Sequence, residues 1–217
     1  MGMNKKQQLA NLVREMEAAA EKLPLTKNAR DIVPPEGNLD ADVMFIGEAA
    51  GYHESVQRRP FVGVAGKLLT QTLTEIGLPR EQVWISNVLK CRPPDNRDPL
   101  PEEIAAYALY LDQEIAIIKP KIIVTLGRFS MGKFLPGVKI SQVHGQARWI
   151  DWRGMKILLV PMYHPAAALR AGEVLRQFKA DFDKLKQILA KIDQEVAELT
   201  EEPETPKLDE AAQLSLL

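Results

Sequence analysis

Four short runs of apolar residues recur along the chain and alternate with longer amphipathic segments. The runs are VMFIG (43–47), VWISNV (83–88), KIIVTLG (121–127) and MKILLVP (155–161). Continuous runs rich in β-branched residues are typical of strands buried on both faces. Their alternation with helices favours parallel pairing, because each connection then crosses the sheet. The pattern predicts an α/β protein, a three-layer α/β/α sandwich around a central four-stranded, mostly parallel sheet.

The segments between the runs predict the helices of one domain. Apolar residues at helical spacing indicate helices over residues 5–22, near 64–77, 101–118 and 128–134, and over about 173–199. Residues 201–210 (EEPETPKLDE) are acidic and too poor in apolar groups to fold. We therefore expect a folded domain over 1–199 and a disordered acidic tail over 200–217.

The residues that follow the predicted strands are candidates for chemistry. Open parallel sheets bind ligands outside the carboxyl ends of their strands. Glu48, Asn87 and His164 stand at or just after such ends, and glycines flank Glu48. A cap, a turn hydrogen bond or a solvated carboxylate is the alternative for each of them.

The near-zero net charge conceals two unlike regions. The chain has 28 Lys and Arg against 29 Asp and Glu, a net charge of −1. Residues 193–217 contain eight acids and one lysine, a net charge of −7, which leaves +6 for the rest. A mildly basic body can neutralise phosphates, so the whole-chain charge does not exclude a nucleic-acid partner.

Several classes of protein are excluded or disfavoured by the composition. One cysteine allows no internal disulfide and no cluster bound by several local thiolates. No apolar run approaches the length of a membrane span, and the N-terminus lacks the apolar core of a signal peptide, so we expect a cytoplasmic protein without a membrane partner. Residues 63–67 (GVAGK) lack the remainder of a phosphate-binding loop, and the three histidines lack companions at metal-ligand spacing.

Five segments, taken in order, resemble the family 4 uracil-DNA glycosylases: GEAAGYHE (47–54), RPFVGVAGKLL (59–69), NVLKCRPPDNRDP (87–99), KPKIIVTLGR (119–128) and YHPAAALR (163–170). The resemblance covers about residues 20–190 and implies the three-layer glycosylase fold. It also implies hydrolysis of the N-glycosidic bond between uracil and deoxyribose in DNA, which leaves an abasic site. Such an enzyme flips the nucleotide out of the duplex or accepts a single strand.

The resemblance implies how the base is bound. His164 resembles the histidine beside O2 of uracil, which donates a hydrogen bond to the developing oxyanion. Asn87 resembles the asparagine that reads the polar edge of uracil, and Phe61 the ring on which the flipped base stacks. Backbone N–H groups around Ala49 and Gly51 are expected to help bind the base.

Charged and polar residues complete the implied site. Glu48 resembles the first-motif glutamate, and Glu54 the glutamate that lies where a thymine methyl group would collide. Asn96 resembles a further asparagine of the family's site. Arg170 is expected to meet the DNA backbone or to enter the vacated base stack, and Arg58 to touch a phosphate.

The chain departs from the family at the positions of a metal cluster. Family 4 members typically bind a four-iron, four-sulfur cluster through four cysteines. The matching positions here are Ala20, Leu23, Cys91 and Tyr107, and one thiolate cannot bind such a cluster. We expect no cofactor, and we hypothesise an apolar plug in which the other three residues pack around Cys91.

Two smaller departures concern the backbone. Ala50 stands where the family prefers proline, which should loosen the loop. Arg58 stands where the family usually has glycine, so the backbone there is expected to avoid a conformation open only to glycine.

The last five residues, Gln213, Leu214, Ser215, Leu216 and Leu217, resemble the peptide by which bacterial repair proteins bind the sliding clamp. A frayed helical end is the alternative interpretation of this short match.

The leading prediction is a monomeric, monofunctional uracil-DNA glycosylase, because the implied site offers no lysine nucleophile. Two alternatives stay open. One is a non-catalytic DNA-binding or clamp-adaptor protein of the same fold, and the other is a glycosylase that prefers another deaminated base. The joint presence of His164, Asn87, Phe61 and Glu48 favours the enzyme.

Overall fold

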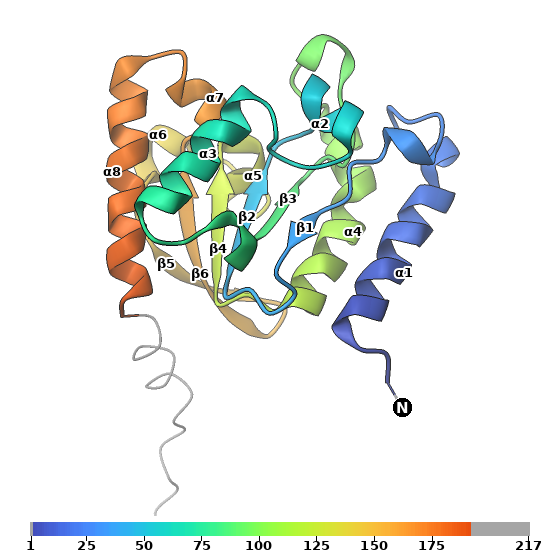
Figure 1. Cartoon of the computed structure of the whole chain (residues 1–217), viewed down its shortest axis with the longest axis horizontal. Helices are drawn as coiled ribbons and strands as arrows, with labels where there is room; N and C mark the ends of the chain where they lie inside the picture. The colour runs from blue at the N-terminus through green and yellow to red at the C-terminus, as the bar shows by residue number, and fades with distance from the viewer. Residues whose placement is uncertain (1, 192–217) are drawn as a thin grey trace, which may run out of the picture.

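The computed structural model describes residues 2–191, which form one six-stranded sheet with helices on both faces (Figure 1). The strand order is β1-β3-β2-β4-β6-β5. The four central strands run parallel: β3 (Trp84–Asn87), β2 (Val43–Gly47), β4 (Ile122–Leu126) and β6 (Met155–Met162). Every residue of β2, β3 and β4 is buried, as strands covered on both faces require. The predicted α/β/α sandwich is confirmed.

Two antiparallel strands extend the sheet at its edges. β1 (Glu36–Gly37) pairs with β3, and β5 (Arg148–Trp152) pairs with β6. Residues of β5 alternate between half-buried and exposed, so this strand lacks the continuous apolar run of the central four. The four predicted strands are thus the central ones, and the sequence pattern missed both edges.

Eight α-helices surround the sheet in the described part of the chain: α1 (Lys5–Ala18), α2 (Tyr52–Gln57), α3 (Val64–Glu75), α4 (Pro101–Ile118), α5 (Arg128–Gly132), α6 (Ile140–Val143), α7 (Pro165–Ala168) and α8 (Gly172–Leu189). The predicted helix over 5–22 ends at Ala18, and residues 20–22 form a separate 3₁₀ turn. Helix α8 ends at Leu189, ten residues before its predicted end, and residues 192–199 lie outside the described range. The short helices α2, α6 and α7 were not predicted.

Alternate residues of the strands pack into two helical layers. Val43 and Phe45 of β2 belong to the core cluster that contains residues of α3 and α8, and the Phe45 ring stacks on that of Phe182 at 6.1 Å. Met44 and Ile46 belong to the cluster on the opposite face, with residues of α4. This alternation follows from the two-residue period of a strand.

The register of the parallel strands brings their carboxyl ends to one edge of the sheet. Gly47, the last residue of β2, pairs with Asn87, the last residue of β3. Leu126 at the end of β4 pairs in the same way with Met162 at the end of β6. The loops that follow these four residues therefore begin side by side.

Residues 192–217 lie outside the described part of the chain. The predicted acidic tail and the candidate clamp peptide both fall there and stay predictions. Within residues 2–191, no helix has both the length and the apolar character needed to cross a membrane.

Candidate active site

A cavity of about 590 Å³ lies where the central strands end. The loops after β2, β4 and β6 all contribute to its wall, which is the expected place for a ligand in an open parallel sheet. The lining includes eight of the predicted site residues: Glu48, Ala49, Gly51, Glu54, Phe61, Asn96, His164 and Arg170. Asn87 and Arg58 are not among the lining residues.

His164 contributes an uncharged hydrogen-bond donor to this cavity. The residue caps the N-terminus of α7, and its Nδ1 accepts a hydrogen bond from the Ala166 N–H at 3.1 Å. Burial lowers the pKa of His164 to about 4, although Glu54 acts in the opposite direction. The imidazole is therefore neutral near pH 7. A neutral ring that accepts at Nδ1 carries its proton on Nε2, which leaves that N–H as the donor.

The ring of Phe61 lies beside His164, with 5.7 Å between ring centroids and 35° between the planes. Phe61 has a φ of +53°, a left-handed conformation that phenylalanine seldom adopts. Two glycines leave room for it. A Cβ at Gly47 would come within 2.3 Å of the ring, and one at Gly66 within 2.0 Å of the Phe61 backbone. A larger residue at either glycine would displace Phe61.

Asn87 lies behind the cavity lining, at the end of β3. Its side chain is buried, and Oδ1 has no hydrogen-bond partner within the described residues. A Cβ at Gly47 would come within 2.4 Å of this oxygen, so Asn87 Oδ1 and the Phe61 ring both pack against Gly47. A buried acceptor without a partner is unfavourable in itself, so Asn87 Oδ1 is a candidate for a hydrogen bond to a ligand.

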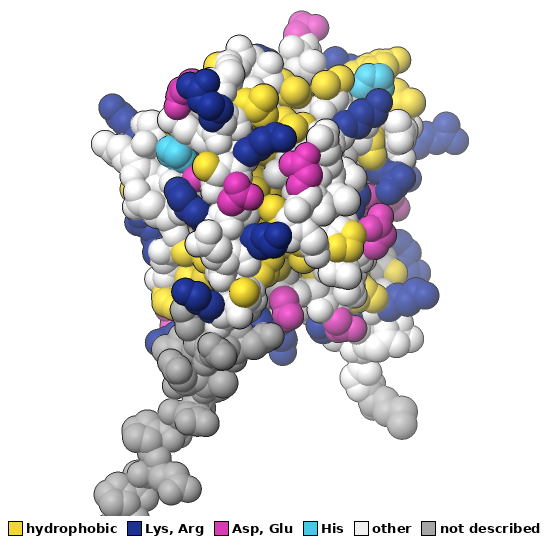
Figure 2. Space-filling view, turned by 60° about the vertical axis from the view of Figure 1, so that its left-hand side comes forward, with side chains coloured by type: hydrophobic (Ala, Val, Ile, Leu, Met, Phe, Trp, Pro, Cys, Tyr) yellow, Lys and Arg dark blue, Asp and Glu magenta, His cyan; other side chains and the backbone are white. Residues whose placement is uncertain are grey.

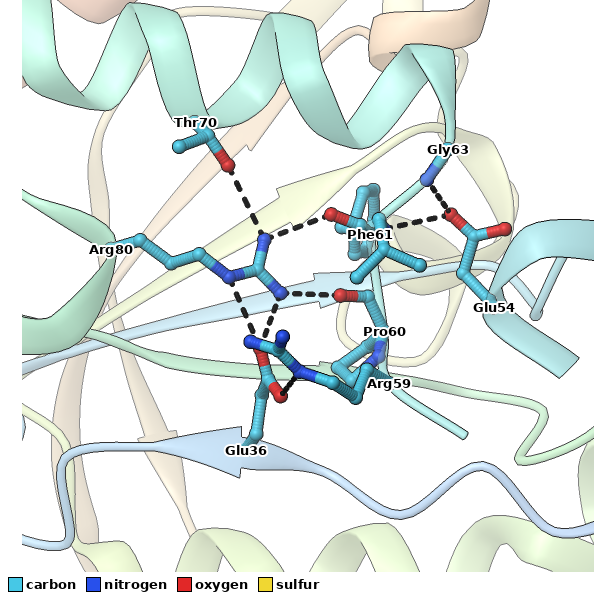
Figure 3. A network of polar contacts seen from close by, with 9 residues as sticks. Glu36, Glu54, Arg59, Pro60, Phe61, Gly63, Thr70 and Arg80 are labelled. Atoms are coloured by element: carbon cyan, nitrogen blue, oxygen red, sulfur yellow. Dashed lines mark hydrogen bonds and ion pairs between the residues drawn. The ribbon is translucent and has the colours of Figure 1, made fainter. Parts of the chain in front are cut away.

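Glu54 of α2 connects two segments of the cavity wall (Figure 3). One carboxylate oxygen accepts hydrogen bonds from the N–H groups of Val62 and Gly63, at 2.9 and 2.7 Å. Because Gly63 has no Cβ, the carboxylate can approach its backbone closely. Glu54 therefore fixes the segment that follows Phe61 while it also lines the cavity.

Glu48, directly after β2, lies in a different electrostatic setting. Burial raises its pKa, and the nearby negative charge of Asp98 raises it further. The cations Arg128 and Arg170 act in the opposite direction. Asp98 and Arg128 also form an ion pair with each other, so their opposite charges partly cancel in the neighbourhood of Glu48.

Main-chain hydrogen bonds attach this loop to the neighbouring segment 88–91. Two N–H groups of that segment donate to the carbonyls of Gly47 and Glu48, at 3.1 and 2.9 Å. The N–H of Ala50 donates to the carbonyl of Cys91 at 3.3 Å. Proline has no N–H, so the residue expected to loosen the loop forms a bond that the family's proline could not form.

A fully buried ion pair attaches the same segment to α4. Lys90 Nζ contacts the carboxylate of Glu114, and the two side chains are 1% and 0% exposed. Lys90 also donates to the Ser86 hydroxyl. Removal of one partner from such a pair typically costs about 3–5 kcal/mol, so this contact anchors the segment firmly.

Asn96, a predicted site residue, and Arg170, a predicted DNA contact, occupy different surroundings. Asn96 is exposed and accepts a hydrogen bond from Arg92 Nε at 2.9 Å. Arg170 is exposed at the rim of the cavity, next to Leu169, an apolar side chain that is 47% exposed. Arg170 thus lines the cavity, and an exposed leucine directly precedes it in the chain.

Arg58 adopts a left-handed backbone conformation at the end of α2. Its φ is +52° and its ψ is 41°, in the left-handed region that favours glycine but is open to other residues, so Arg58 avoids a conformation open only to glycine, as expected. The residue ends α2, a position where that conformation is common. Its guanidinium pairs with Glu17 of α1 and donates to the Ile32 carbonyl at 3.0 Å. The charge of Arg58 therefore joins α1 to the domain and is already matched there.

Charges of both signs are interspersed on the face shown in Figure 2, with apolar side chains between them. The excess positive charge calculated for the body of the chain is thus not gathered into one patch on this face.

The four cluster positions form part of an ordinary core. Ala20, Cys91 and Tyr107 are fully buried in one apolar cluster, and Leu23 packs against it. The carbonyl of Pro24 accepts hydrogen bonds from the Tyr107 hydroxyl at 2.9 Å and from Cys91 Sγ at 3.7 Å. These residues do not fit an iron–sulfur cluster, because they provide one thiol and burial raises its pKa to about 11. The hypothesis of an apolar plug around Cys91 agrees with this packing.

Cys91 is expected to resist thiol reagents in the folded protein and to react at full rate in denaturant, because the thiolate is the reactive species and burial keeps the thiol protonated. A chromogenic disulfide reagent, used with and without guanidinium, measures this difference. Iron and sulfide analysis of the same sample should find neither in stoichiometric amount. A brown protein with both would contradict the plug.

Some lining residues were not singled out from the sequence. Arg128 and Asp98 form an exposed ion pair, and the Tyr163 ring lies at a tilt beside that of His144, with 4.5 Å between centroids. Arg128 follows the end of β4, so the positional rule that nominated Glu48 also applied to it. Asp98 lies in a loop without such a signal.

Comparisons with known proteins show the family to which the chain belongs. A family model described as the uracil DNA glycosylase superfamily matches residues 34–190. A type-4 uracil-DNA glycosylase of Saccharolobus solfataricus is 44% identical over 186 residues, which cover 83% of this chain and 86% of the relative. A type-4 uracil-DNA glycosylase of Thermotoga maritima is 41% identical over 191 residues, which cover 87% of this chain and 99% of the relative. A chain with this identity, this fold and this cavity at the strand ends belongs to the uracil-DNA glycosylase superfamily, and within it to the type-4 family.

Proposed function

We propose that this protein hydrolyses the N-glycosidic bond of uracil in DNA as a monofunctional glycosylase, leaving an abasic site. One observation above all supports the proposal: His164 is neutral, its Nδ1 is already occupied, and its remaining N–H belongs to the cavity. The relatives that share this fold are named for uracil excision from DNA.

The neutral imidazole suits the chemistry of the leaving group. Uracil departs as an anion, and negative charge grows on its O2 oxygen as the glycosidic bond lengthens. A donor already in place stabilises that charge without reorganisation, and one such donor is worth about 10²–10³-fold in rate. The Ala166 N–H orients the ring for this role by binding the opposite nitrogen.

Base recognition is assigned to the group of residues around Gly47. The Phe61 ring offers an apolar surface for stacking, and the unpartnered Asn87 Oδ1 offers an acceptor for the N3–H of uracil. Glu54, fixed by two backbone N–H groups, would collide with the methyl group of thymine. Together these contacts select uracil by shape and by hydrogen bonding.

The sugar and the DNA strand require other residues. As uracil leaves, positive charge develops on deoxyribose, and the Glu48 carboxylate supplies a nearby negative charge. Extraction of the nucleotide costs a few kcal/mol of unstacking. Leu169 and Arg170 at the rim are suited to offset that cost, through apolar contact with the stack and charge contact with the backbone.

Monofunctional chemistry predicts cleavage that depends on alkali. No lysine is present among the lining residues of the cavity, so no Schiff base with the sugar is available to cut the strand. Labelled oligonucleotides bearing uracil, hypoxanthine or xanthine, single-stranded or opposite each base, should be incubated with the protein and then divided. We expect intact strands without alkali and cleavage at uracil after alkali, with a thymine oligonucleotide as the control.

Other outcomes of this assay identify the alternatives. Cleavage at hypoxanthine or xanthine but not at uracil would indicate a glycosylase for another deaminated base. No cleavage at any base would favour a non-catalytic DNA-binding protein. Cleavage before alkali would contradict the monofunctional assignment.

A further inference from the structure

The backbone around Phe61 is hydrogen-bonded from two sides (Figure 3). On one side Arg80 Nη1 donates to the Phe61 carbonyl at 2.9 Å, and Nη2 donates to the Pro60 carbonyl. On the other side Glu54 accepts from the N–H groups of residues 62 and 63. Four consecutive residues, 60–63, are therefore fixed by two charged side chains.

A carboxylate in turn orients Arg80. Glu36 Oε1 accepts from Arg80 Nε at 3.1 Å and from Nη2 at 2.6 Å, and the two side chains are only 12% and 25% exposed. Burial alone would raise the pKa of Glu36, but hydrogen bonds from Arg59 and Arg80 lower it, so the carboxylate stays charged. Thr70 Oγ1 is a further acceptor, at 3.4 Å from Nη1.

This network surrounds an unfavourable backbone conformation, the left-handed φ of Phe61. A left-handed phenylalanine persists only where its surroundings determine it. The two glycines at residues 47 and 66 leave room for Phe61 but do not hold it there. Arg80 is the side chain whose planar guanidinium reaches both carbonyls of the segment, a geometry that a lysine could not reproduce.

We infer that Arg80 is a positioning residue for base excision: through the carbonyls of Pro60 and Phe61 it sets the place of the Phe61 ring beside His164. Arg80 is not among the residues that line the cavity, so its effect passes through Phe61. The inference rests on the proposed function and extends it to a residue outside the cavity lining.

Two variants of the same network separate position from charge. Arg80→Gln removes the bonds to both carbonyls. Arg59→Gln is the matched control, because Arg59 pairs with the same Glu36 and neither of these carbonyls is its partner. We expect Arg80→Gln to lower the single-turnover rate of uracil excision by about 10- to 100-fold, the scale of a misplaced group in a site. Arg59→Gln should change it by less than about twofold, as surface substitutions usually do.

A double-mutant cycle with Phe61→Ala tests the route of the effect. If Arg80 acts through the ring, Arg80→Gln should change the rate of the Phe61→Ala protein by less than about threefold, because the ring it positions is gone. Losses that multiply in the double variant would overturn the inference. DNA affinity that depends less steeply on salt in Arg80→Gln, by a slope equivalent to about one charge, would also overturn the inference. Such a change would mean that Arg80 contacts a phosphate.

A readout without substrate keeps the inference separate from the proposed function. The chain has three histidines, so the ring protons of His164 can be assigned by NMR from a His164→Gln variant. The ring current of Phe61 acts on them at a centroid distance of 5.7 Å. Their shifts should change in Arg80→Gln and not in Arg59→Gln, and unchanged shifts in Arg80→Gln would overturn the inference.

Folding of the variants is checked by thermal unfolding. If Arg80→Gln is unfolded at the assay temperature, Glu36→Gln serves instead, because it keeps Arg80 and removes the charge that orients it. In that case Glu36→Gln should have little further effect on the excision rate of the Phe61→Ala protein. If the losses in rate of the two single variants multiply in the double variant, the inference is overturned. A wild-type protein that excises no uracil would contradict the proposed function, while the NMR shifts would still decide the place of the ring.

Discussion

Replacement of His164 with alanine is expected to slow uracil excision by about 10²–10³-fold in single-turnover assays, the usual effect of deleting one oxyanion donor. The imidazole N–H is the donor that the cavity offers to the departing base, and Ala166 already occupies the other ring nitrogen. Binding of uracil-containing DNA should weaken far less, because the charge on O2 develops only in the transition state. His53→Ala is the control, since His53 is exposed and does not line the cavity.

The pH profile tests whether the donor is neutral. A pKa of about 4 leaves the folded-state imidazole uncharged throughout the neutral range. The wild-type rate should therefore show no transition near the ordinary histidine value of about 6.5. A charged donor would lose activity as the pH rises through its pKa, so a fall in rate between about pH 6 and 8 that disappears in His164→Ala would contradict the assignment. An unchanged rate in His164→Ala would remove the histidine from the mechanism.

Replacement of Asn87 with alanine is expected to slow excision by about 10- to 100-fold, since a carboxamide that reads a base edge is worth about 1–3 kcal/mol. Oδ1 is buried and has no hydrogen-bond partner among residues 2–191, so its contribution is made only when the base is bound. For the same reason the unfolding midpoint should stay close to that of the wild type. The lost packing is offset by the release of a buried acceptor that lacks a partner.

Thr125→Val supplies the matched control for Asn87→Ala. Thr125 Oγ1 is also buried and has no hydrogen-bond partner in the described part of the chain, and this residue belongs to β4 but not to the cavity lining. Excision by Thr125→Val should equal that of the wild type. If Asn87→Ala instead lowers the unfolding midpoint strongly and leaves excision by the folded fraction intact, Asn87 is structural and does not read the base.

The sequence predicted the central fold well, because strands that are buried on both faces have a recognisable hydrophobic pattern. β2, β3 and β4 are continuous apolar runs, and their order with the helices determines a parallel sheet. The edge strands carry no such signal. β1 has only two residues. The residues of β5 alternate between half-buried and exposed, and the strand is positioned by its antiparallel pairing with β6. Four-residue helices such as α7 also cannot be predicted from hydrophobic periodicity, because they span little more than one turn.

The candidate site was predictable where chemistry follows strand ends and unpredictable where distant residues determine a backbone angle. Glu48 and His164 follow β2 and β6 closely, and topology brings them to one cavity. The left-handed angle of Phe61 depends on Arg80, which stands 19 positions away, and on space left by glycines. The backbone angle of Arg58 was likewise not predicted from the sequence. Its left-handed angle follows from its place at the end of α2, where capping decides the conformation.

The Pro24 carbonyl and the apolar residues around Cys91 support the same segment that hydrogen-bonds to the site loop at Ala50. Within residues 2–191 that support is made by backbone hydrogen bonds and side-chain packing, and the four cluster positions provide one thiol. Scarcity of iron, chelators, or the oxidants that dismantle metal clusters should therefore leave the loop in place.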